Sequence, residues 1–198
     1  DWTSGTVYSA YDDHMDSLEM AVLGHHFYVL TSEYHVFKCL SNNYGAQSTV
    51  MPNILVTTTH FQTSDGYIWK YMYSLDAEEK LRFLTPSFMP VKTLSEGDNS
   101  QQWNVQENAI DGAIHVIKVT DGLSLIHIVI DNLGYGYTYA SVQLLSSLGS
   151  GATAEPSISP NGGHGSDPLA ELGGSYLVFN IRLKDTEGDI LTTHNDYR

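Results

Sequence analysis

The stretch YIWKYMY at residues 67–73 is the densest aromatic run of this chain. Successive side chains of a β-strand point to opposite faces, so the alternation predicts a strand with one aromatic and one mixed face. The aromatic face holds Tyr67, Trp69, Tyr71 and Tyr73, and the mixed face holds Ile68, Lys70 and Met72. Burial in a core is the favoured use of such a face, although sugar platforms and interface hot spots use the same residue types.

The segments before and after this strand extend the prediction of a sheet. Residues 26–30 and 35–40 are apolar runs joined by residues 31–34, a pattern that predicts a β-hairpin. Helical spacing of apolar residues predicts a short helix within residues 12–24, and Asp76 has the position of an N-cap for a second one.

The second half of the chain has a different composition. After a polar break at residues 95–102, runs rich in Val and Ile alternate with Gly turns. The runs at 113–119, 125–130 and 137–144 predict an antiparallel meander, and the alternation at 176–183 predicts a last strand.

The predicted fold class is mainly β, with antiparallel β-sandwich-like modules and a few short helices. Composition agrees, because only 16% of residues are charged whereas Tyr and Gly number 13 and 17. The predicted modules are an N-terminal β module with the hairpin and aromatic strand (1–94), a Gly-turn β meander that is a candidate insert (95–157), and the Gly-rich loop with a closing strand that packs back on the first module (158–198). Because the sequence starts at Asp1 without an initiator Met and stops at Arg198, we expect a fragment of a longer protein.

Charge and hydropathy narrow the range of partners. The chain has 9 Lys and Arg against 23 Asp and Glu, a formal net charge of −14, so we expect no nucleic-acid partner and no attraction to anionic lipid. No run approaches the ~20 apolar residues of a membrane-spanning helix, so we expect no membrane. The single cysteine, Cys39, lies in an apolar run, where a buried thiol in a reducing compartment is expected.

Motifs of catalysis and of metal binding are absent from the sequence. The 9 histidines form no HExxH or HxH element, no CxxC pair occurs, and no serine lies in a GxSxG elbow. His25 and His26 are neighbours that point to opposite faces in a strand and do not chelate together. We therefore predict a protein that is not an enzyme, with no catalytic residue, no cofactor and no metal.

The sharpest local signal is GGHGSDP at residues 162–168, which we call the glycine loop. Its glycines permit positive φ and close backbone approach, as a cradle for an anion requires, and His164 with Asp167 is a candidate metal pair. The favoured interpretation is a tight turn in which these two side chains hydrogen-bond the backbone. A phosphate loop also needs a Lys and the N-terminus of a following helix, and no Lys and no long helix follow here.

Several stretches resemble, in order, one family of structural proteins. They are residues 27–30, 36–45 and 48–52, TSDGYIWKYMY at 63–73, residues 83–86 and 89–92, ISPNGGHGSDP at 158–168 and ELGG at 171–174. This ordered set is similar to the baseplate wedge subunit, encoded by gene eight, of T-even-like contractile-tailed bacteriophages, particularly those of marine cyanophages. GYGYT at 134–138 and GSGATA at 149–154 look like the Gly-rich repeats of a β module inserted in these subunits.

The resemblance implies a mainly β virion protein without catalytic residues or cofactors. It implies a homodimer that joins other baseplate wedge proteins in the tail baseplate, assembled in the host cytoplasm. The candidate structural or interface residues are Trp69, Lys70, Tyr71, Gly162, Gly163, His164, Gly165, Asp167 and Pro168. The alternative from a different class is a carbohydrate-binding β protein that uses exposed aromatic residues such as Trp69 and Trp103.

Overall fold

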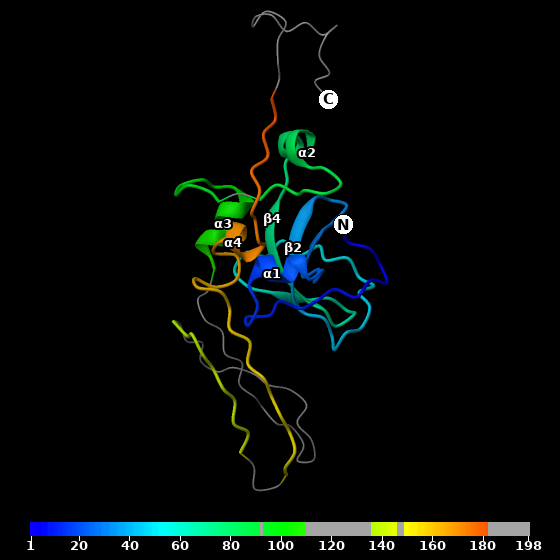
Figure 1. The fold of residues 1–198 in the computed structure, drawn as a ribbon, viewed down its shortest axis with the longest axis vertical. Coiled ribbons are helices and arrows are strands. Elements are labelled where there is room, and N and C mark those ends of the chain that lie inside the picture. Colours follow the sequence, from blue (N-terminus) through cyan, green and yellow to red (C-terminus); the bar gives the residue numbers. More distant parts are fainter. Residues whose placement is uncertain (92, 110–135, 146–148, 182–198) are drawn as a thin grey trace, which may run out of the picture.

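The protein is built around a four-stranded antiparallel sheet with a few short helices (Figure 1). The computed structural model describes residues 1–91, 93–109, 136–145 and 149–181. The strands are β1 (Tyr28–Leu30), β2 (His35–Ser41), β3 (Phe61–Gln62) and β4 (Ile68–Ser74), in the order β1-β2-β4-β3. The helices are α1 (Ser17–Val22), α2 (Ala77–Phe83), α3 (Gln101–Glu107) and α4 (Pro168–Glu171).

The predicted hairpin and aromatic strand are confirmed. β1 and β2 pair antiparallel, and β2 lies between β1 and β4 at the centre of the sheet. The turn between β1 and β2 uses Tyr34 at a φ of 65°, and Thr31 Oγ1 accepts a hydrogen bond from His35 N at 3.2 Å.

The prediction that four aromatic residues share one face of β4 is wrong for Tyr73. Val36 pairs with Tyr73 and Phe37 pairs with Tyr71, so Met72 is an extra residue in β4 and forms a bulge. One inserted residue reverses the alternation beyond it. Tyr73 therefore packs in the same cluster as Met72, whereas Tyr71 packs in the other.

The helices differ from their predicted bounds for local reasons. α1 begins at Ser17 and not near residue 12, because the Asp16 side chain accepts hydrogen bonds from Leu18 N and Glu19 N as the N-cap. α2 follows Asp76 as predicted, with a complete capping box.

α3 begins at Gln101, at the end of the polar break identified at residues 95–102. Ser100 caps the helix by accepting from Trp103 N, and Gln102 and Val105 are buried against the rest of the molecule. Tertiary burial of one face adds to the stability of this short helix.

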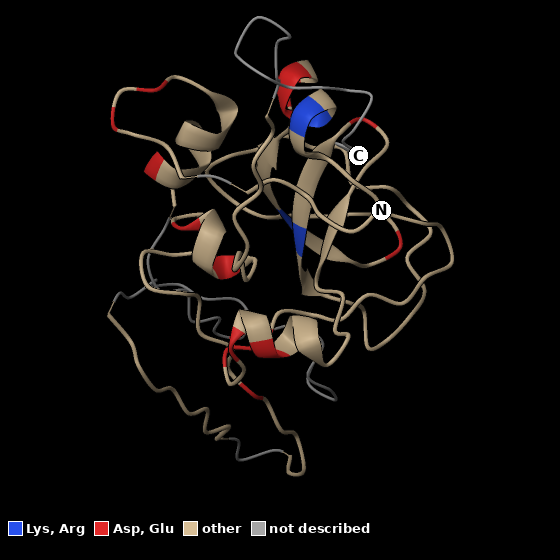
Figure 2. Cartoon of the chain, turned by 45° about the horizontal axis from the view of Figure 1, so that its top comes forward, with Lys and Arg blue, Asp and Glu red and all other residues tan. Residues whose placement is uncertain are grey.

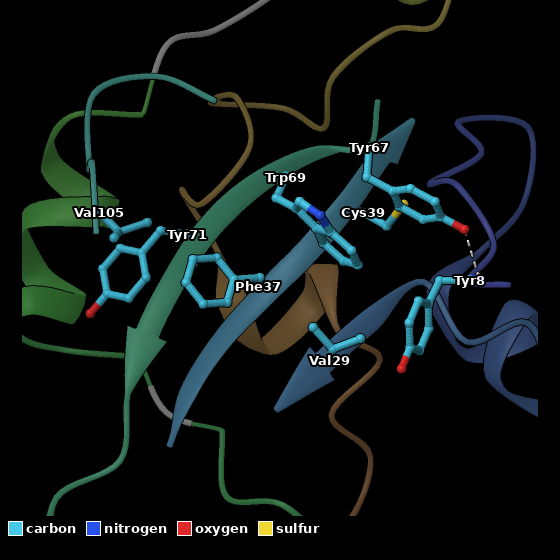
Figure 3. Packing of buried hydrophobic residues seen from close by; sticks show 8 residues of the cluster. All are labelled: Tyr8, Val29, Phe37, Cys39, Tyr67, Trp69, Tyr71 and Val105. Carbon is cyan, nitrogen blue, oxygen red and sulfur yellow. Dashed lines mark hydrogen bonds between the residues drawn. The ribbon is translucent and has the colours of Figure 1, made fainter. Parts of the chain in front are cut away.

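Two clusters of buried side chains make up the core. The first contains Tyr8, Val29, Phe37, Cys39, Tyr67, Trp69, Tyr71 and Val105 (Figure 3). Within it the rings of Tyr67 and Trp69 stack with centroids 5.4 Å apart. The second contains Met20, Phe27, Leu30, Val36, Met72, Tyr73, Leu75 and Leu172.

Two extended segments project from opposite ends of this body (Figure 1). Residues 136–145 and 149–160 form one projection, and residues 176–181 run past α2 in the other. Neither 137–144 nor 176–181 is a strand here, in contrast to the predictions, and the predicted strands at 113–119 and 125–130 lie outside the described residues. Within the described ranges, no helix is long and apolar enough to cross a membrane.

Candidate functional site

The aromatic strand singled out by the sequence is enclosed in the core. Trp69 and Tyr71 are fully buried, and Lys70 between them is also buried. Tyr71 Oη donates a hydrogen bond to Gln101 Oε1 on α3 at 2.9 Å, so its polar end is satisfied inside the molecule. These side chains therefore provide packing and no platform for a sugar.

The glycine loop forms the predicted tight turn ahead of α4. Gly162, Gly163 and Gly165 have φ values of 82°, 84° and 97°, in the region that favours glycine. Asp167 caps α4 by accepting a hydrogen bond from Ala170 N at 3.1 Å, with Pro168 in the first turn. The expected backbone hydrogen bond of His164 is not formed through Nδ1, which is buried and lacks a partner among the described residues.

Glu171 of α4 fastens the glycine loop to the sheet. Its Oε1 accepts hydrogen bonds from Gly165 N at 2.7 Å and from Asp167 N at 3.1 Å, while its Oε2 accepts one from Lys38 Nζ on β2 at 2.6 Å. The Glu171 carbonyl also accepts from Ser17 Oγ at 2.9 Å, which joins α4 to α1. One carboxylate thus holds loop, helix and central strand together.

Lys70 of β4 brings a second positive charge to this place, directly opposite Lys38 in the strand ladder. Figure 2 shows Lys and Arg in blue and Asp and Glu in red. Apart from those on α2, the blue residues lie on strands of the sheet, whereas the red residues lie on loops and helices. Lys70 Nζ donates to Thr57 O at 2.8 Å. Burial lowers the pKa of Lys70 to about 8, against the opposing effect of Glu171. Burial likewise lowers the pKa of Lys38, and the Glu171 carboxylate counters this.

His164 completes this set, which we call the ionic cluster: Lys38, Lys70, His164 and Glu171. The His164 ring meets the Tyr11 ring edge-on at a centroid distance of 5.1 Å, and Lys38 Nζ lies 4.2 Å from the centroid of the same Tyr11 ring. Burial, and then the charges of Lys38 and Lys70, hold the pKa of His164 well below 6.5. The imidazole is therefore neutral at pH 7, although part of the residue is exposed.

The loop approaches the core so closely that only glycine fits at one position. A Cβ on Gly165 would lie 2.4 Å from Val105 Cγ1 of α3 and 3.3 Å from Lys70 Cε. Both Glu171 oxygens are occupied, and the clefts described below are lined by no member of the ionic cluster. This arrangement stabilises the loop.

Reasoning from sequence missed Lys38 and Glu171, and it placed Lys70 on the sheet without a partner. The available signal was a lysine in the middle of each of two apolar strand runs, VFKCL and IWKYM. A buried ammonium group needs a carboxylate, and the sequence leaves several acidic residues as candidates.

The candidate metal pair His164 and Asp167 belongs to no set of three potential ligands among the described residues. In the described ranges, the one set of three side chains that could hold an ion is Asp12, Asp13 and His14, at the surface. Its carboxylates already accept hydrogen bonds, from His14 N at 2.9 Å and from Ile158 N at 2.9 Å. Exposed acidic groups of this kind are ordinary surface features.

A cleft of about 1000 Å³ lies between the N-terminal segment and residues 84–89. Its aromatic lining includes Trp2, Tyr8, Tyr28, Tyr34 and Phe88. Among the described lining residues Asp1 is the single carboxylate, so they do not supply the carboxylate pair of a glycosidase.

A more apolar groove of about 540 Å³ lies beside residues 176–178. Its walls come from α1, from residues 87–91 and from the segment after α4. Exposed apolar side chains continue from this groove along the chain to Ile181, which is 75% exposed.

Comparisons with models of protein families, with curated proteins and with solved structures find no match to this chain.

Proposed function

We propose that this chain is a structural virion protein, a baseplate wedge subunit of a contractile phage tail. The observation that carries an assembly role is the run of large apolar side chains at residues 176–181, four of which are at least 75% exposed. Apolar patches of this kind on a folded protein mark surfaces that bind other proteins. The phage baseplate itself is supported by the ordered sequence motifs, which include both the aromatic strand and the glycine loop.

The most polar part of the interior supports a role without catalysis or cofactor. The ionic cluster has the charges of an active site, but its carboxylate is saturated and its lysines are buried. Burial also raises the pKa of the Cys39 thiol to about 12, which keeps the thiol protonated and unreactive.

The proposed partners are other baseplate wedge proteins and a second copy of this chain, with no nucleic acid and no membrane. A net charge of −14 agrees with this choice, because it repels phosphate backbones and anionic lipid. We propose that the whole chain is mainly β with sandwich-like modules, is assembled in the host cytoplasm and resides in the tail baseplate.

Cross-linking of intact tail particles followed by mass spectrometry tests this proposal. We expect cross-links from α1, α2 and residues 176–181 to other baseplate subunits. Cross-links to copies of this chain alone, or absence of the chain from purified tails, would contradict it.

The second candidate, a carbohydrate-binding protein, rests on the cleft lined by Trp2, Tyr28 and Tyr34. Aromatic rings in an open cleft are suited to stacking on sugar faces. Titration of a panel of oligosaccharides, monitored by tryptophan fluorescence, distinguishes the two functions. Saturable binding that Trp2→Ala abolishes favours the carbohydrate function, and no binding favours the assembly protein.

A further inference from the structure

Residues 176–181 have the sequence of a β-strand but lie outside the sheet. The run YLVFNI is rich in the aromatic and branched residues that favour strands. Its side chains are unusually exposed, with Tyr176 at 77%, Leu177 at 86% and Phe179 at 79%. We call residues 176–181 the arm.

The backbone of the arm is unpaired. Among the described residues, no backbone N–H or C=O of the arm makes a hydrogen bond to another residue. Such a segment is a template for pairing with another strand.

Two contacts nevertheless hold the arm against the body. The rings of Tyr176 and Phe88 meet edge-on with centroids 5.4 Å apart, and Asn180 Nδ2 donates to Arg82 O at the end of α2 at 3.1 Å. The arm is thus fixed near both of its ends, and a partner strand would pay less conformational entropy to bind it.

The apolar groove lies beside the arm, and a partner strand could bury apolar side chains in it. Leu18 and Val22 of α1 and Leu169 of α4 line the groove together with Val178 of the arm. Leu18 and Val22 are 45% and 78% exposed, so this apolar surface is uncovered in the single chain.

The charges around the groove indicate the chemistry of the partner. Glu79 lines the groove, and Glu19 lies on α1 beside Leu18. The nearby bases of α2 are engaged, because Arg82 pairs with Glu78 at 2.5 Å and Lys80 lies over the Tyr34 ring at 3.5 Å. A second copy would bring the same net charge of −14, whereas a basic partner would be attracted.

We propose that the arm is an open strand that pairs with an extended segment of another protein, in which apolar and basic residues alternate. The apolar residues of that segment would enter the groove and its basic residues would face Glu79 and Glu19. This inference rests on the proposed function, since it assigns a binding mode to an assembly subunit.

Amide hydrogen exchange with a synthetic peptide of alternating valine and lysine tests the inference. We expect the peptide to slow exchange in the arm by about tenfold or more, and the Leu177→Asp variant to lose this effect because Leu177 lines the groove. A peptide of alternating valine and glutamate should give no protection. Leu145→Asp is the matched control, because Leu145 is 84% exposed but lies outside the groove, and it should behave as wild type.

Three results would overturn the inference. One is arm amides that are already protected in the dilute protein, since the chain itself would then cover the arm. Another is protection that grows with protein concentration without peptide, since the occupant would then be a second copy. The third is no protection by the valine–lysine peptide. These results are independent of the phage assignment, which fails instead if the chain is missing from tail particles.

Discussion

Lys38 Nζ and Glu171 Oε2 lie 2.6 Å apart inside the protein, although 133 residues separate them in the sequence. The side chains of this pair are 0% and 2% exposed. The pair joins the central strand of the sheet to the helix that follows the glycine loop. Because the other carboxylate oxygen accepts hydrogen bonds from two amides of that loop, Glu171 joins the loop to the sheet.

Removing the negative charge of this pair should destabilise the fold. Glu171→Gln leaves the Lys38 ammonium buried without a counter-charge, so the free energy of unfolding should fall by about 3–5 kcal/mol. Glu78→Gln is the matched control, because Glu78 pairs with Arg82 at the surface and should cost no more than about 0.5 kcal/mol. Chemical denaturation measures both, and equal losses would contradict the role of Glu171.

Removing both charges together should lower the free energy of unfolding by less than the sum of the losses in the two single variants. In the double variant Lys38→Met, Glu171→Gln, the Lys38 ammonium is no longer stranded, and the Gln oxygen still accepts from the loop amides. A double-mutant cycle should give a coupling of about 1–3 kcal/mol between the two sites. Additive effects would show that the two residues contribute separately.

His164 should make stability depend on pH in the weakly acidic range. The unfolded chain binds a proton below pH 6.5, whereas the folded protein keeps His164 neutral, so acid favours the unfolded state. Stability should therefore fall as pH drops from 6.5, by up to about 1.4 kcal/mol per pH unit, until the pKa of the folded state is reached.

The variant His164→Phe isolates this contribution from the other histidines. It keeps an aromatic ring against Tyr11 and removes an Nδ1 that has no hydrogen-bond partner in the described chain. The difference in unfolding free energy between wild type and variant should grow between pH 7.5 and 5, and a constant difference would refute the assignment.

Asp65 affects stability at lower pH than His164. Burial raises the pKa of Asp65, but hydrogen bonds from Thr63 and from backbone amides outweigh this effect and hold the pKa below 3.8. The stabilisation that Asp65 provides is therefore lost only below that pH.

The close approach of the glycine loop to α3 can be tested at Gly165. Gly165→Ala must place a Cβ 2.4 Å from Val105 Cγ1 at a φ of +97°. Gly97→Ala is the control, because Gly97 also has a positive φ, of +88°, but open space around it. We expect about 1 kcal/mol of destabilisation at Gly97 and about 1–3 kcal/mol more at Gly165. Val105→Ala in the Gly165→Ala background should recover part of the difference in thermal unfolding.

Local sequence pattern predicted the elements that depend on neighbouring residues. The hairpin of β1 and β2, strand β4 and the Asp76 cap of α2 follow from alternation and capping. The bulge at Met72 depends instead on how β4 is paired with β2, and this information is spread over two strands. The position of Tyr73 was therefore mispredicted even though its strand was correct.

The ionic cluster also could not be predicted from local sequence pattern, because its residues lie far apart in the sequence. Its glycine loop was visible in the sequence as a run of residues with unusual conformational freedom. The groups that hold this loop lie outside it, because Glu171 is on α4 and its partner Lys38 is on β2. α3 was missed because a helix of seven residues has little periodicity to detect, and the face that it buries, with Gln102 and Val105, is defined by tertiary packing.

The central claim is that this chain is a structural subunit of a contractile tail baseplate. Under this claim a contractile-tailed phage encodes the chain, and electron cryo-microscopy of its intact tails is the most direct test. The account predicts density for the four-stranded sheet in the baseplate wedge, with the arm contacting a different subunit. Tails whose baseplate density is fully explained by other proteins, with no place for this sheet, would contradict it.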